Sequence, residues 1–173
     1  LQTKKGVTTM TKKMQDALNI QCNAELESFY IYLAMANYLE NKGYKGSAHW
    51  MSLQADEEYD HYKQFSSFIS DVEGSVSLEG INKPTTTWNT IQDVFESGLA
   101  HEKTISKKIN ALVSIAKLEK DYSAENFLQG FVTEQVEEEV TFRDILTELN
   151  MIKDNSAGLL MFDKGLGNRS QIK

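Results

Sequence analysis

Four glutamates recur where a helical pattern calls for an apolar side chain. Each lies well inside a long segment in which apolar residues alternate at spacings of three and four, and each segment contains one of them: Glu25, Glu58, Glu102 and Glu138. Such a stripe faces the core of a helical bundle. An unpaired carboxylate is costly there, because burial and neighbouring like charges both raise its pKa. A bound cation is the natural compensation, so the four glutamates predict a buried metal site.

His61 adds a nitrogen ligand to this set, because it lies three residues after Glu58 on the same helix face. Carboxylate oxygens suit hard cations, and an imidazole shifts the preference toward iron, manganese or zinc. One glutamate from each of two helices, with a Glu-x-x-His pair from each of the other two, is the pattern of di-iron carboxylate bundles. The second pair is altered here, since Gln135 and Glu138 stand where glutamate and histidine are expected.

Simpler explanations exist for each residue alone. A single glutamate in an apolar stripe can reach back to solvent, and Glu-x-x-His occurs freely on solvated helices. Four glutamates at matched depth are harder to explain in this way. Glu25 and Glu58 lie at comparable distances from one turn between helices, and Glu102 and Glu138 from another, so we expect all four at one level of the core. Tyr32, two turns after Glu25 on its stripe, is expected to reach the same level.

Four long helices must position these residues, and sparse glycine and proline mark their ends. We expect the helices over residues 11–40, 47–72, 90–118 and 123–149, and a short fifth helix over 155–163.

The single proline, Pro84, lies in a loop at 74–87. About 14 extended residues span roughly 46–50 Å, and a helix of about 27 residues is about 40 Å long. The loop can therefore travel the whole bundle. We predict an all-α fold, a four-helix bundle with a long crossover between the second and third helices.

The bulk composition fits one domain over residues 1–173, with 1–10 as a flexible N-terminal extension. The chain is 40% hydrophobic and 25% charged, as globular proteins are. No apolar run reaches the roughly 18–20 residues of a membrane span. The net charge of −7 disfavours binding to a nucleic-acid backbone. We therefore expect neither a nucleic-acid nor a membrane partner.

The only cysteine, Cys22, excludes an intrachain disulfide and a cysteine-based zinc site. A reducing, cytoplasmic location fits this composition. The sequence starts with Leu1, and no apolar signal region follows. We interpret the start as trimmed or processed, which leaves a plastid or mitochondrial location open.

Over essentially its whole length the chain resembles bacterial-type non-haem ferritins of the ferritin-like di-iron carboxylate family. The resemblance lies in four stretches: NAELESFYIYLAM, QADEEYDHY, LAHEKTISKKINAL and FLQGFVTEQVEEEVTF. It implies iron storage with ferroxidase activity, in which Fe(II) is oxidised by dioxygen or hydrogen peroxide and stored as a ferric mineral. It also implies a hollow homo-oligomeric cage of 24 subunits, with the fifth helix near a four-fold axis.

The resemblance assigns roles around a ferroxidase centre that holds two irons. It implies that Glu25 and His61 hold one iron, that Glu102 and Glu138 hold the other, and that Glu58 bridges them.

Further roles follow from the same resemblance. Gln135 would lie close to the second iron, and Tyr32 would act as an electron donor. A third iron site beside the centre would use Glu57, Glu134 and Glu137, with Glu138 shared.

Differences from other di-iron carboxylate proteins narrow the resemblance to the non-haem ferritins. Bacterioferritin-like and rubrerythrin-like proteins carry the second Glu-x-x-His pair, which is missing here. Bacterioferritins bind haem through a methionine next to the bridging glutamate, where this chain has Tyr59, so we expect no haem. Gly130 stands where close relatives often have tryptophan.

Two alternative functions stay open: a di-iron oxygenase or peroxidase acting on another substrate, and a non-catalytic helical interaction module.

Overall fold

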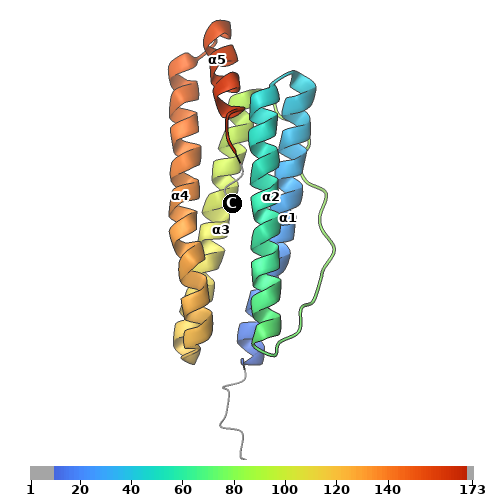
Figure 1. The fold of residues 1–173 in the computed structure, drawn as a ribbon, viewed down its shortest axis with the longest axis vertical. Coiled ribbons are helices and arrows are strands. Elements are labelled where there is room, and N and C mark those ends of the chain that lie inside the picture. The colour runs from blue at the N-terminus through green and yellow to red at the C-terminus, as the bar shows by residue number, and fades with distance from the viewer. Residues whose placement is uncertain (1–9, 171–173) are drawn as a thin grey trace, which may run out of the picture.

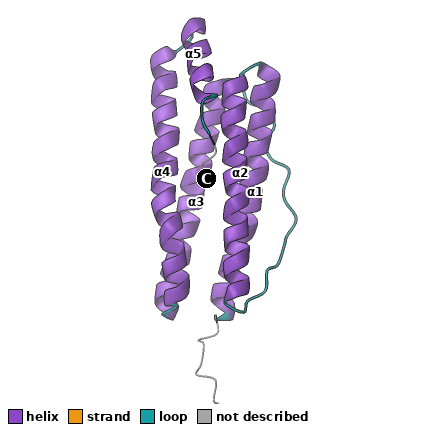
Figure 2. Cartoon of the chain, viewed as in Figure 1, coloured by secondary structure: helices purple, strands orange, loops and turns teal. Residues whose placement is uncertain are grey.

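The computed structural model describes residues 10–170, which form five helices and no strand (Figures 1 and 2). Their bounds are Lys12–Lys42 (α1), Lys45–Asp71 (α2), Ile91–Glu119 (α3), Tyr122–Ile152 (α4) and Ser156–Leu166 (α5). The predicted all-α bundle with a short fifth helix is confirmed. The expected flexible extension lies, apart from Met10, outside the described residues.

Local chemistry explains the start of α1, α3, α4 and α5 and the end of α1. Thr11, Asp121 and Asn155 each accept a hydrogen bond from a backbone N–H of the first turn, which satisfies a donor that the helix leaves unpaired. Thr90 forms a reciprocal capping box with residue 93. Gly43 ends α1 with a φ of 87°, a left-handed conformation that glycine adopts without strain.

Helix α2 takes its N-terminal cap from a distant part of the chain. Its own N-cap residue makes no side-chain cap bond. The buried Asp163 of α5 instead accepts from the backbone N–H of Gly46 at 3.0 Å and from the N–H and hydroxyl of Ser47 at 2.8 and 2.7 Å. A carboxylate is favoured at this position by the helix dipole. The two helices meet so closely that a Cβ on Gly46 would lie 1.6 Å from the Asp163 carbonyl oxygen.

The connection between α2 and α3 travels the length of the bundle, as Figure 1 shows. Helices α2 and α3 therefore run in the same direction, and each is antiparallel to its hairpin partner. The long crossover predicted from the loop length is confirmed.

Amide side chains of α1 hold this crossover in register. Three of them, four residues apart, bond the backbone of every second residue from Ser75 to Glu79. The bonds join Gln15 to Ser75 (3.1 Å), Asn19 to Ser75 (2.9 Å) and Ser77 (2.7 Å), and Asn23 to Ser77 (2.7 Å) and Glu79 (2.8 Å). Four helical residues rise about 6 Å, and two extended residues advance about 6.6 Å. The two periods match closely enough for consecutive rungs to form, and we call this set the amide ladder.

The core has two apolar halves separated by a polar layer. One half surrounds Tyr32 and Phe95 toward the α5 end, and the other surrounds Leu18 and Phe131. Along each of α1 to α4, one buried glutamate falls between the residues of the two halves. The predicted common level of the four glutamates is therefore the boundary between the apolar halves.

Candidate metal centre

The polar layer consists of one buried glutamate from each long helix. Glu25 of α1, Glu58 of α2, Glu102 of α3 and Glu138 of α4 are 1%, 2%, 0% and 8% exposed. No lysine or arginine is among the buried polar residues of the described chain. Four carboxylates with one imidazole and no buried lysine or arginine among them form a layer that a cation would stabilise.

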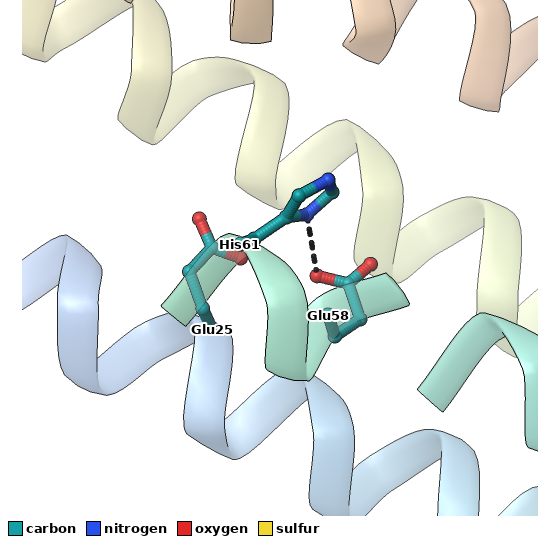
Figure 3. Close-up of side chains that lie close together, drawn as sticks. All are labelled: Glu25, Glu58 and His61. Carbon is teal, nitrogen blue, oxygen red and sulfur yellow. Dashed lines mark hydrogen bonds and ion pairs between the residues drawn. The ribbon is translucent and has the colours of Figure 1, made fainter. Parts of the chain in front are cut away.

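Three ligands of this layer already lie together. Glu25, Glu58 and His61 each offer one ligand atom, and these atoms lie within 4.8 Å of one another (Figure 3). No other such group of three occurs among residues 10–170. Oε2 of Glu25 is buried and accepts no hydrogen bond. A buried acceptor without a donor is costly, and a metal ion at this position would satisfy it.

His61 is oriented by a carboxylate on the opposite side of its ring. Nε2 lies 3.0 Å from Oε1 of Glu134 on α4, and Nδ1 lies 3.3 Å from Oε2 of Glu58. Burial lowers the pKa of His61, but the hydrogen bonds to Glu134 and Glu58 outweigh it and raise the pKa well above its ordinary value. With a proton on Nε2 donated to Glu134, Nδ1 faces the carboxylates and can bind a metal. A second partner of this kind commonly fixes the tautomer of a metal-bound histidine.

The α3–α4 side of the layer is held by hydrogen-bond donors. The hydroxyl of the fully buried Tyr32 donates to Oε1 of Glu102. Gln135 donates from Nε2 to the other oxygen of Glu102 at 2.9 Å. Glu138 accepts from Nε2 of Gln54 at 3.1 Å. These bonds fix the two carboxylates, while their anionic oxygens remain suited to a hard cation.

The layer holds protons that a cation would replace. Burial, followed by the charge of Glu58, raises the pKa of Glu25 to about 8. Burial raises the pKa of Glu102 and of Glu138 to about 7 each; the neighbouring charge of Glu138 adds to the first shift, and those of Glu57 and Glu58 add to the second. The pKa of Glu58 is also raised, mainly by burial. Cation binding therefore releases protons near neutral pH.

The residues expected for a third site are not gathered around one point. Glu57 pairs with Arg169 at 2.6 Å, and Glu134 pairs with His61. Glu137 is exposed. Gly130 is also exposed, and a Cβ added there meets nothing within 4 Å, so the position has room for a larger side chain.

Three functional neighbours were not found from the sequence. Gln21 donates to Oε1 of Glu25 at 2.7 Å, Gln54 donates to Glu138, and Arg169 contacts Gln54 and Glu57. Gln21 and Gln54 each lie one helical turn before a core glutamate, and this spacing is the signal that could have revealed them. No local pattern marks Arg169.

The fold and the carboxylate layer together define a ferritin-like domain. The model of the ferritin-like domain family matches residues 15–152, and the chain belongs to this family.

Within this family, the chain is similar to bacterial non-heme ferritins. A bacterial non-heme ferritin of Bacteroides fragilis is 40% identical over 160 residues, which cover 92% of this chain and 99% of the relative. A probable bacterial non-heme ferritin-like protein of Haemophilus influenzae is 37% identical over 93% of this chain and 98% of the relative. These relatives support a role in iron storage.

Solved structures agree with this assignment. The open-pore ferritin of Archaeoglobus fulgidus superimposes with a TM-score of 0.92 at 40% identity, over 94% of this chain and 99% of the other. An engineered closed form of the same ferritin gives a TM-score of 0.93 at the same identity and coverage.

None of the helices between residues 10 and 170 has the length and apolarity to cross a membrane.

Proposed function

We propose that this chain is the subunit of an iron-storage protein that oxidises Fe(II) at a di-iron centre between its four long helices. The observation that carries the proposal is the polar layer, in which Glu25, Glu58 and His61 converge on one side and Glu102 and Glu138 are buried on the other.

We assign one substrate ion to each side of the polar layer. Glu25 and His61 hold one Fe(II), Glu102 and Glu138 hold the other, and Glu58 bridges them. Gln135 keeps Glu102 in place beside the second ion. Anionic oxygens stabilise Fe(III) more than Fe(II), so this set favours loss of one electron from each iron. Dioxygen accepts two electrons and two protons as hydrogen peroxide, or peroxide accepts them as water.

The chain's own groups manage protons and geometry during this reaction. The carboxylates with raised pKa values give up their protons as Fe(II) enters. Glu134 holds the Nε2 proton of His61, which keeps Nδ1 directed at the first iron. The pKa of Tyr32 is raised well above its usual range by burial and by the charge of Glu102, so its hydroxyl stays protonated. We assign Tyr32 as an electron donor to the centre.

Exposed apolar surfaces support assembly into a cage that encloses the ferric mineral. Ile20, Tyr30, Leu78 and Ile81 are 44–67% exposed on α1 and the crossover, and residues of these two segments line a groove of about 800 Å³. Apolar surface of this kind marks protein contacts, and homo-oligomers close through such self-complementary faces. We propose a cage of 24 copies.

Two further expectations accompany the cage. The buried, free thiol of Cys22 suits a reducing cytoplasm. Tyr59, next to the bridging glutamate, offers no thioether to haem, so the cage is proposed without it.

Anaerobic Fe(II) titration followed by admission of air tests the proposal. We expect two rapidly oxidised irons per chain, on a particle of about 470 kDa, the mass of 24 chains of 19.6 kDa. Glu58→Ala and His61→Ala should each abolish the fast phase and leave the particle intact. Glu148→Gln, at an exposed position of α4, is the matched control. A monomer that binds no iron, or unchanged rates in both variants, would contradict the proposal.

A further inference from the structure

The chain after α5 continues along the bundle toward its middle (Figure 1). Arg169 in this segment contacts three residues on one face of α2. Its Nη2 lies 2.6 Å from Oε2 of Glu57, and its Nη1 donates to Oε1 of Gln54 at 2.9 Å. Nη1 also lies 3.4 Å from the carbonyl oxygen of Trp50, and the guanidinium lies 4.4 Å from the centroid of the Trp50 ring. The C-terminal segment is therefore anchored by the Arg169 side chain, and the Arg169 carbonyl oxygen adds a contact at 3.0 Å to Nε2 of His49 on α2.

These contacts suit arginine and no other cationic side chain. Residues 50, 54 and 57 are spaced four and three apart, so they share one helix face. A planar guanidinium can stack on the indole while its fork bonds two acceptors at once, whereas a lysine ammonium is a compact, strongly hydrated point charge. The side chains of Arg169 and Glu57 are 19% and 24% exposed, so the pair is screened less than a surface ion pair.

The guanidinium occupies one of the carboxylates that the family resemblance assigns to a third iron site. This carboxylate is Glu57, and Arg169 already neutralises it. Gln54 extends the link, because it accepts from Arg169 and donates to Glu138, which the third site shares with the ferroxidase centre. A metal ion bound through Oε2 of Glu57 would therefore replace the guanidinium.

We propose that Arg169 is an internal competitor for the third metal site. The side chain occupies Glu57 until a multivalent cation displaces it, and the C-terminal segment leaves the Trp50 ring when this happens. Arg169 thus sets the affinity of the site and selects for ions of higher charge. This inference rests on the third site that the family resemblance implies, and on the proposed iron-storage function. It assigns to Arg169 a positioning role, without contact with the reacting irons.

Zinc binding measures the competition without redox chemistry. Calorimetric titration of the assembled, metal-free protein with Zn²⁺ should show the two core sites per chain and a weaker third class. Arg169→Gln should strengthen the third class about tenfold, since one charge-assisted pair contributes roughly 1.4 kcal/mol or more, and should change the core sites far less. Arg143→Gln is the matched control, because Arg143 pairs with Glu139 on α4 at 3.3 Å; it should behave as the parent does.

Trp50 fluorescence reports the displacement itself. In a Trp88→Phe background Trp50 is the only tryptophan. Zn²⁺ at third-site concentrations should change its emission, and Glu57→Gln should remove that change. Equal strengthening of all sites in Arg169→Gln, unchanged third-site binding, or a silent Trp50 would overturn the role of Arg169. If the core sites still bind two Zn²⁺ per chain in that case, the proposed function stands. If no variant binds Zn²⁺ at all, both proposals fail.

Discussion

Glu25→Gln should make the metal-free protein more stable at neutral pH while destroying its first metal site. Glu25 is 1% exposed, and its Oε2 accepts no hydrogen bond. The substitution keeps the shape of the side chain and the acceptor that bonds Gln21. It removes a group that folding forces to hold a proton.

The magnitude follows from the pKa of Glu25, which is about 8 in the fold against 4.5 ordinarily. A raised pKa adds stability that is fully present below the unfolded value and is lost as pH rises through the folded value. The contribution of Glu25 to the free energy of unfolding therefore falls as pH rises from about 4.5 to about 8. At pH 7 the loss is about 3 kcal/mol, and at pH 5 it is less than about 1 kcal/mol. Glu25→Gln should recover these amounts.

The assay is denaturant unfolding of metal-free protein in chelator at pH 5 and pH 7, with the exposed Glu148→Gln as control. The variant should gain stability over the parent at pH 7 and little at pH 5. Added Zn²⁺ should reverse the order at pH 7, because only the parent keeps all its ligands. An equal difference at both pH values, or a less stable variant at pH 7, would refute the argument that Glu25 is held protonated by burial.

Three further substitutions test other parts of the structure. Gly46→Ala should lower the unfolding temperature and increase hydrogen exchange in α5, because its Cβ would collide with the carbonyl oxygen of Asp163; Gly165→Ala, where a Cβ meets nothing within 4 Å, is the control that should change neither. Gly130→Ala should stabilise α4 by about 0.5–1 kcal/mol with iron oxidation unchanged, and a loss of stability in thermal unfolding would show that the position is not open. Glu134→Gln should weaken Zn²⁺ binding at the first site about 10- to 100-fold, and calorimetry showing equal affinity would exclude its role in orienting the imidazole ligand.

Periodicity predicted the core well because a helix repeats its environment every turn. The buried residues of α4 recur at alternating spacings of four and three from Ala124 to Leu149, as the predicted stripe requires, and among those of α3 only Val94 departs from this spacing. Helix α1 buries more than its stripe, since Asn19 also faces the crossover. The level of the four glutamates was predictable for the same reason. Each is counted from a short turn, and helical rise is constant.

Contacts between segments far apart in the sequence could not be predicted from helical periodicity. Asp163 caps α2 through Gly46, which lies 117 positions earlier in the chain, and Arg169 reaches Glu57 across 112 positions. Neither partner lies in a repeating pattern, and both contacts depend on how α5 ends against α2. The third-site carboxylates were named by the family resemblance, but their actual partners depend on side-chain conformation. Periodicity does not determine that conformation.

The amide ladder makes the length of the crossover matter for the metal centre. Its rungs join every second residue of an extended segment, so one residue inserted between Ser75 and Glu79 would turn the following rung away from α1. At the other end, the Tyr38 hydroxyl donates to the carbonyl oxygen of Trp88, just before α3 begins. The crossover is thus fastened near both ends. These two fastenings, and not the number of residues between them, help to hold the second hairpin at the level where Glu102 faces Glu25. Natural length variation should therefore be accepted between residues 80 and 87, and rejected within the ladder.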